Sequence, residues 1–286
     1  MKWQGRRGSD NIEDRRAGGG GRTMAMGGGL GIVVLIIGFL MGGDPMTLLK
    51  NFQQQSAVSA PAAGAPLQES AQEKQLAQFV SVVLADNEQI WDQVFRENGM
   101  TYRKPKLVLF RSSVQSGCGG ATAQTGPFYC PADEKIYIDL SFFDDLTKKL
   151  GAHGEFSLAY VIAHEVGHHV QHLLGTSNKV RQLQAKTNEK GANRLSVALE
   201  LQADFYAGLW TNHNAKYNQV IEQGDIEEAL SAANAVGDDR LQQQAQGRVV
   251  PDAFTHGTSE QRMYWFKRGF QTGDIKQGDT FSELRL

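Results

Sequence analysis

The sequence lacks an excess of charge of one sign, and it is poor in cysteine. Its 29 lysine and arginine residues nearly balance 31 aspartate and glutamate residues, so the formal net charge is −2 and no nucleic-acid partner is implied. Neither of the two cysteines, Cys118 and Cys130, belongs to a Cys-x-x-Cys pair, which disfavours a cysteine zinc site. No internal repeat is visible. A single long apolar run gives little support for a pore or a transporter.

That run covers residues 23–43, which carry no charged side chain. Its length matches the roughly 20 residues that a helix needs to cross a bilayer, so we expect a transmembrane helix and a membrane partner here. Residues 1–22 hold six basic and three acidic side chains, which predicts a disordered basic tail kept in the cytoplasm. The main domain would then lie on the outer side. A cleaved signal peptide and a buried helix of a soluble domain are the two alternatives.

The outer side of the membrane is an oxidising compartment, in which two cysteines can form a disulfide. The two cysteines flank a short glycine-rich loop, and a disulfide between Cys118 and Cys130 would close it. Such a bridge contributes about 3 kcal/mol by restricting the unfolded chain. We therefore expect a structural disulfide.

The rest of the chain divides into a linker and one domain. Residues 44–70 are rich in alanine, glutamine and proline and predict a linker, and residues 71–286 are numerous enough for one domain with its own core. Two short β-prone segments, 106–110 and 135–139, favour a small sheet. After residue 141 apolar spacing predicts helices at 142–150, 156–174, 178–190, 193–213, 225–236 and 259–272. The expected fold class is α+β and mostly helical, with a small β element, and the domain follows one transmembrane helix.

The sequence His-Glu-x-x-His occurs within the predicted helix 156–174. Four residues advance a helix by about 400° and about 6 Å, so His164 and His168 point the same way and can share one zinc ion. Glu165 is rotated by about 100° from His164 and can reach a water at the metal as a general base. A polar stretch of a surface helix is the alternative, but the preceding residues are apolar.

A catalytic zinc needs a third protein ligand. His172 lies about 12 Å along the helix axis from His164, too far to share its ion. The metzincin pattern is excluded, because Gln171 and Leu174 stand where it requires glycine and histidine. The remaining candidate is Glu200.

Glu200 and Asp204 lie one turn apart on the predicted helix 193–213. Glu200 can bind zinc, while Asp204 on the same face can accept the outer N–H of a ligand histidine. A solvated acidic edge is the alternative reading, but the neighbouring residues are mostly apolar. Two carboxylates in such surroundings are costly unless a positive charge compensates them.

The ordered set of motifs resembles the gluzincin arrangement and, more closely, the bacterial family of neutral zinc metallopeptidases. The resemblance covers nearly the whole chain and rests on Arg6-Arg7-x-Ser9-Asp10-Asn11-x-Glu13-Asp14-Arg15-Arg16, the apolar run, His164-Glu-Val-Gly-His-His-Val-Gln171, Glu200-Leu-Gln-Ala-Asp204 and Thr255-His-Gly-Thr-Ser-Glu-Gln-Arg262. It implies a zincin-like metallopeptidase domain in which His164, His168 and Glu200 bind zinc and Glu165 is catalytic. It implies little about the substrate.

Together these features predict a peptidase of the bacterial inner (cell) membrane, single-pass, with a cytoplasmic N-terminus and a periplasmic or extracellular main domain. One Zn²⁺ would activate a water to hydrolyse peptide bonds of a peptide or protein substrate. His256 is a candidate second donor to the oxyanion, although it could equally be a residue that packs near a helix cap. The alternative function is a catalytically silent zinc-binding module tethered to the membrane. The intact Glu165 disfavours it, because a structural site needs no general base.

Overall fold

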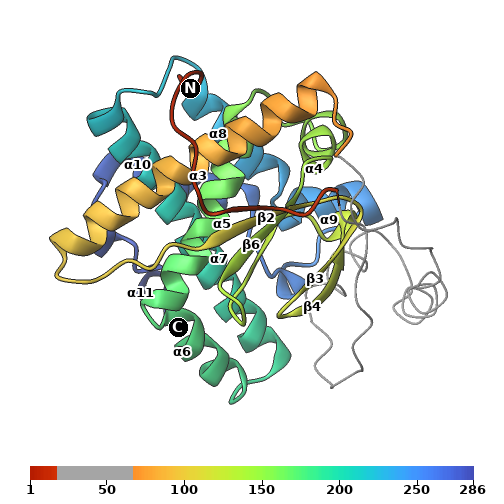
Figure 1. Ribbon diagram of the computed structural model, residues 1–286. Coiled ribbons are helices and arrows are strands. Elements are labelled where there is room, and N and C mark those ends of the chain that lie inside the picture. Colours follow the sequence, from red (N-terminus) through yellow and green to blue (C-terminus); the bar gives the residue numbers. More distant parts are fainter. Residues whose placement is uncertain (18–66) are drawn as a thin grey trace.

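A computed structural model describes residues 1–17 and 67–286, which form a small mixed sheet packed against a set of helices (Figure 1). The predicted transmembrane helix 23–43 and most of the linker 44–70 lie outside the described residues. Among the residues that are described, no helix is long and apolar enough to cross a membrane. The mostly helical α+β class is confirmed.

The sheet has four strands in the order β1-β2-β6-β5, and a separate hairpin pairs β3 with β4. The two predicted strands, β2 (Lys106–Phe110) and β6 (Lys135–Asp139), pair in parallel over their whole length. The strands that the sequence did not predict are β1 (Ile12–Asp14), β3 (Ser113–Ser116), β4 (Gly119–Thr122) and β5 (Phe128–Cys130). The predicted disulfide between Cys118 and Cys130 is present and ties the β3–β4 hairpin to β5.

The N-terminal segment, residues 1–17, is part of this fold, so the expectation of a disordered tail is wrong there. Strand β1 pairs in parallel with β2, and Figure 1 shows the segment in red running past α3 (Ala71–Glu97) to reach it. Trp3 is 4% exposed and stacks edge-on against Phe79 of α3. The Arg6 guanidinium donates two hydrogen bonds to the buried Asp86 carboxylate, at 2.5 and 2.6 Å.

The helices follow the predicted order, with boundaries that differ by a few residues. They are α4 (Phe142–Asp144) with a π-helical turn to Lys149, α5 (Phe156–Leu173), α6 (Thr176–Gln184), α7 (Glu189–His213), α8 (Asp225–Ala235), α9 (Asp238–Gln246), α10 (Ser259–Thr272) and α11 (Thr280–Glu283). Helices α9 and α11 were not predicted. Local signals set several starts: the Asn188 side chain caps α7, and Thr258 with Gln261 forms a capping box at α10.

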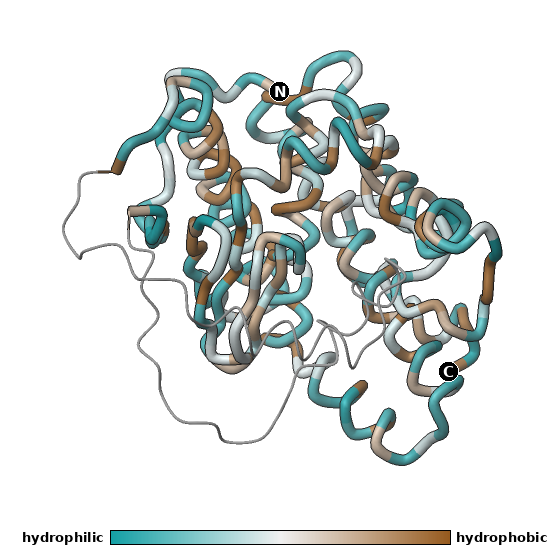
Figure 2. Tube along the Cα trace, turned by 90° about the vertical axis from the view of Figure 1, so that its right-hand side faces the viewer, coloured by the Kyte–Doolittle hydropathy of each residue, from teal (hydrophilic) through white to brown (hydrophobic). Residues whose placement is uncertain are grey.

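Helix α5 occupies the centre of the domain and packs against α3, α7, α8 and β5. Its residues from Phe156 to Gly167 are all buried, which agrees with the apolar run ahead of the histidine motif. Figure 2 shows hydrophobic residues gathered in the central helices and strands and hydrophilic ones in the turns around them. The core therefore holds α5 rigidly at the place where its polar motif begins.

Candidate metal centre

Two helices meet at a glycine inside the histidine motif. A Cβ atom on Gly167 of α5 would lie 3.1 Å from both the Cα and the carbonyl oxygen of Ala203 on α7. The absence of a side chain at position 167 therefore lets the two helices approach closely. Ala203 stands between Glu200 and Asp204, so this contact brings both carboxylates against His164 and His168.

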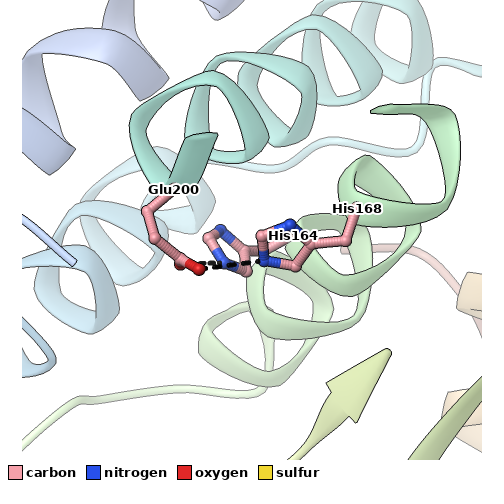
Figure 3. A group of neighbouring side chains, drawn as sticks. All are labelled: His164, His168 and Glu200. Atoms are coloured by element: carbon pink, nitrogen blue, oxygen red, sulfur yellow. Dashed lines mark hydrogen bonds and ion pairs between the residues drawn. The ribbon is translucent and has the colours of Figure 1, made fainter. Parts of the chain in front are cut away.

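Three side chains converge there, as the sequence predicted: His164, His168 and Glu200 (Figure 3). Each offers one ligand atom, and the three atoms lie within 4.8 Å of one another. His164 Nε2 is 3.1 Å from Glu200 Oε2, and His168 Nε2 is 3.4 Å from Glu200 Oε1. Four ligands placed tetrahedrally about 2.0–2.1 Å from a zinc ion are themselves about 3.3 Å apart. The two separations between a histidine nitrogen and a Glu200 oxygen are close to that value.

The outer nitrogen of each histidine already has an acceptor. His164 Nδ1 is 2.8 Å from Asp204 Oδ1, and His168 Nδ1 is 2.9 Å from Gln171 Oε1. A carboxylate or amide oxygen can only accept, so each Nδ1–H donates to its partner, and each Nε2, turned toward Glu200, is the nitrogen left to bind an ion. The expected position of Asp204 relative to His164 is therefore the one that the structure shows.

The role of Gln171 was not foreseen. The sequence marks it only as a residue that departs from the metzincin pattern. In the structure its amide nitrogen donates to the Leu199 carbonyl at 2.6 Å, which leaves its oxygen pointing at His168. Its position three residues after His168 on a helix was the available signal.

The charges around the centre attract a cation. Burial lowers the pKa of His164, but the Asp204 carboxylate and the hydrogen bond to Glu200 outweigh burial and raise the pKa to about 10. Burial would raise the pKa of Glu200, but His168 and His164 outweigh it and hold the pKa well below its usual range. Positive charge is thus favoured between these groups, which is the electrostatic condition for a divalent ion.

Glu165 lies beside the ligands without joining them. It is 7% exposed, and among the described residues its carboxylate makes no hydrogen bond and no ion pair. A carboxylate with both oxygens free can accept a proton from a water in reach of the centre.

His256 lies on the loop before α10, close enough for the Glu200 charge to affect its pKa. Its Nδ1 is 3.1 Å from Asp238 Oδ1, and the backbone N–H groups of residues 255–257 donate to the other oxygen of the same carboxylate. Burial lowers the pKa of His256, but the Asp238 hydrogen bond and the Glu200 charge outweigh it and raise the pKa. The imidazole is thus held in one place and favoured in its protonated, donating form.

Two neighbouring histidines are separate from the centre. His169 is fully buried and bonds to the Tyr129 hydroxyl and the Arg103 carbonyl, while His172 lies 3.4 Å from Glu134. Burial lowers the pKa of His169 to about 4, so it stays neutral. Both histidines act as packing residues.

Comparison with known proteins supports the motif-based resemblance. The family model described as "Putative neutral zinc metallopeptidase" matches residues 1–281. The "Uncharacterized protein YpfJ" of Escherichia coli K12 is 53% identical over 99% of both chains. The "Uncharacterized protein Mb2605" of Mycobacterium bovis is 44% identical over 65% of both. No solved structure matches the chain, so the zincin-like fold stays a prediction. With nearly its whole length covered, the chain belongs to the neutral zinc metallopeptidase family.

Proposed function

We propose that this protein is a zinc-dependent peptidase in which His164, His168 and Glu200 hold one zinc ion and Glu165 is the general base. The observation that carries the proposal is the convergence of two imidazoles and one carboxylate, whose ligand atoms lie within 4.8 Å of one another, the ligand types of a catalytic zinc site. Family membership supports the class of enzyme.

The number of ligands favours catalysis over a structural role. Structural zinc sites usually have four protein ligands, whereas catalytic sites have three and leave one position open. Among the described residues, no fourth ligand-type side chain joins the three. A silent zinc-binding module, the alternative function, would gain nothing from a free carboxylate at position 165.

Each residue then has a distinct chemical task. Zinc bound here would lower the pKa of a water and polarise the substrate carbonyl. Glu165 takes a proton from the attacking water and can return it to the leaving amine. His256, held by Asp238, donates a hydrogen bond to the oxyanion that develops on the carbonyl.

Zinc content and hydrolysis of a labelled unstructured protein, such as casein, test the proposal on the full chain. Wild type should hold about one zinc per chain and cleave the substrate. Glu165→Gln should keep its zinc and lose roughly 10²–10⁴-fold in turnover, the usual contribution of general acid–base catalysis. Glu200→Ala should lose the zinc.

A matched control is Glu260→Gln, which alters an exposed glutamate at the start of α10. It should behave as wild type in both measurements. Undiminished turnover in Glu165→Gln would refute the general-base role, and zinc retained in Glu200→Ala would place the third ligand elsewhere.

A further inference from the structure

Arg262 of α10 is a guanidinium buried beside the metal centre, with 4% of its surface exposed. Its Nε donates to Asp204 Oδ2 at 2.8 Å, and its Nη2 donates to Asp204 Oδ1 at 3.0 Å. Its Nη1 donates to the Val236 carbonyl at 3.3 Å. The planar guanidinium therefore grips Asp204 at two points, the geometry that lysine cannot reproduce.

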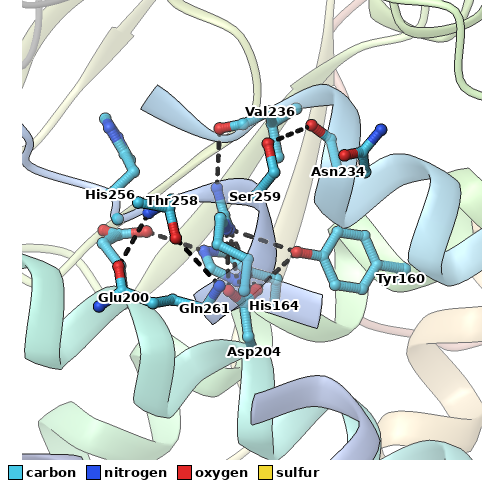
Figure 4. Close-up of polar contacts among 12 residues, drawn as sticks. Tyr160, His164, Glu200, Asp204, Asn234, Val236, His256, Thr258, Ser259 and Gln261 are labelled. Atoms are coloured by element: carbon cyan, nitrogen blue, oxygen red, sulfur yellow. Dashed lines mark hydrogen bonds and ion pairs between the residues drawn. The ribbon is translucent and has the colours of Figure 1, made fainter. Parts of the chain in front are cut away.

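Asp204 is held by further donors on the same oxygen. The Tyr160 hydroxyl donates to Oδ1 at 2.5 Å, and the His164 Nδ1–H donates to it at 2.8 Å. Figure 4 shows Tyr160, His164 and Asp204 gathered around this point. With four hydrogen bonds to two oxygens and no exposed surface, the carboxylate has one orientation available.

The charges in this region balance only when Arg262 is included. Glu165, Glu200 and Asp204 carry three negative charges, and Arg262 carries one positive charge. With neutral imidazoles the sum is −2, which one divalent cation neutralises. Without the guanidinium, the buried Asp204 would lack a permanent positive partner, and such a carboxylate is strongly disfavoured.

We propose that Arg262 is a positioning residue for the metal centre. It fixes the plane of the Asp204 carboxylate, Asp204 fixes the His164 ring and its Nδ1–H tautomer, and the His164 Nε2 lone pair consequently points at the ion. The proposal rests on the zinc-binding role proposed above for His164. A guanidinium that only joined α7 to α10 would affect folding but not the affinity or geometry of the site.

Two measurements separate these roles on the full-length protein. The first is zinc affinity, obtained by competition with a chromophoric chelator. The second is the visible absorption spectrum of the Co²⁺-substituted protein, which reports the geometry of the ligands. Arg262→Met should weaken zinc binding by roughly 10–100-fold, the usual cost of removing an outer partner of a metal ligand, and should alter the Co²⁺ spectrum.

Arg262→Lys covers the case in which Arg262→Met does not fold. It keeps the charge but loses the two-point grip, so we expect an intermediate affinity and a changed spectrum. The matched control is Asn212→Ala. It removes the hydrogen bond from Asn212 to the Phe270 carbonyl, which joins the same two helices eight residues from Asp204 along α7. The control should lose stability and keep wild-type zinc affinity and spectrum.

Each outcome bears on a different claim. A folded Arg262 variant with wild-type affinity and an unchanged Co²⁺ spectrum overturns the positioning role and leaves the zinc site intact. Wild-type protein that binds no zinc overturns the proposed function, and this inference with it. Wild-type protein that binds zinc but cleaves no peptide removes only the peptidase activity.

Discussion

Gly208 on α7 and Gly269 on α10 lie against each other's helix backbone. A Cβ atom on Gly208 would come within 2.0 Å of the Phe266 carbonyl oxygen, and one on Gly269 within 2.0 Å of the Phe205 carbonyl oxygen. The two backbones therefore touch with no side chain between them. This contact holds α10 close enough to α7 for Arg262 to reach Asp204. Asp204 lies one turn before Gly208 on α7.

Gly208→Ala should destabilise the fold by at least about 1–3 kcal/mol, because the added methyl meets rigid backbone and the helices must separate. Gly269→Ala should cost a similar amount. Once one substitution has moved the helices apart, the second methyl group clashes less. The double variant should therefore lose less unfolding free energy than the two single variants added together. Urea unfolding of the three variants measures these differences. A Gly208→Ala protein as stable as wild type would contradict the contact.

Trp3→Ala should lower the free energy of unfolding by about 3–5 kcal/mol, the range for deleting a large buried aromatic side chain. Trp3 is buried against Phe79, and its indole N–H donates to Glu155 at 3.0 Å. Urea unfolding provides the measurement. Arg7→Ala serves as a control in the same segment, because the Arg7 side chain is 83% exposed and should cost little. Equal stability of the two variants would argue that residues 1–17 do not pack on the domain.

The contribution of Glu13 should disappear in acid. Burial raises the pKa of Glu13, but Lys135 and Arg15 outweigh it and lower the pKa to about 2, from 4.5 in the absence of these partners. Because the folded pKa is the lower one, the stabilisation is present above about pH 4.5 and is lost as the pH falls toward 2. Glu13→Gln should be less stable than wild type at pH 7, by no more than about 1 kcal/mol because solvent screens the pairs. The difference should shrink in urea unfolding at pH 3.

Zinc should raise the melting temperature of the protein. An ion that binds only the folded state at 100 times its Kd adds about 2.7 kcal/mol. Calorimetry with zinc and after treatment with EDTA measures the shift. Glu200→Ala should show no such shift, and a wild-type protein indifferent to EDTA would count against the centre.

The helices that carry the centre could be predicted because their signals are local. The apolar residues before His164 and the four-residue spacing of Glu200 and Asp204 each lie within one helix. Helix α9 escaped prediction because Asp238–Gln246 is mostly polar and has no apolar stripe. Strand β1 escaped prediction because it has only three residues, two of them charged, and its partner strand is more than 90 residues away.

The residues that support the metal ligands were harder to predict from the sequence than the ligands themselves. Nothing in the sequence near Arg262 indicates that its guanidinium reaches Asp204, 58 residues earlier, because that contact depends on how α7 and α10 cross. The same holds for Tyr160. The sequence predicts only a buried aromatic residue there, whereas in the structure its hydroxyl donates a hydrogen bond to Asp204. A metal ligand can be recognised from spacing, but its supporting partners come from tertiary packing.

Strand β1 also makes the sheet depend on the first residues of the chain. Backbone hydrogen bonds join it to β2, from the Leu107 N–H to the Asn11 carbonyl at 2.9 Å and from the Arg15 N–H to the Leu109 carbonyl at 2.8 Å. The four-stranded sheet is therefore complete only when the first seventeen residues fold together with residues 67–286.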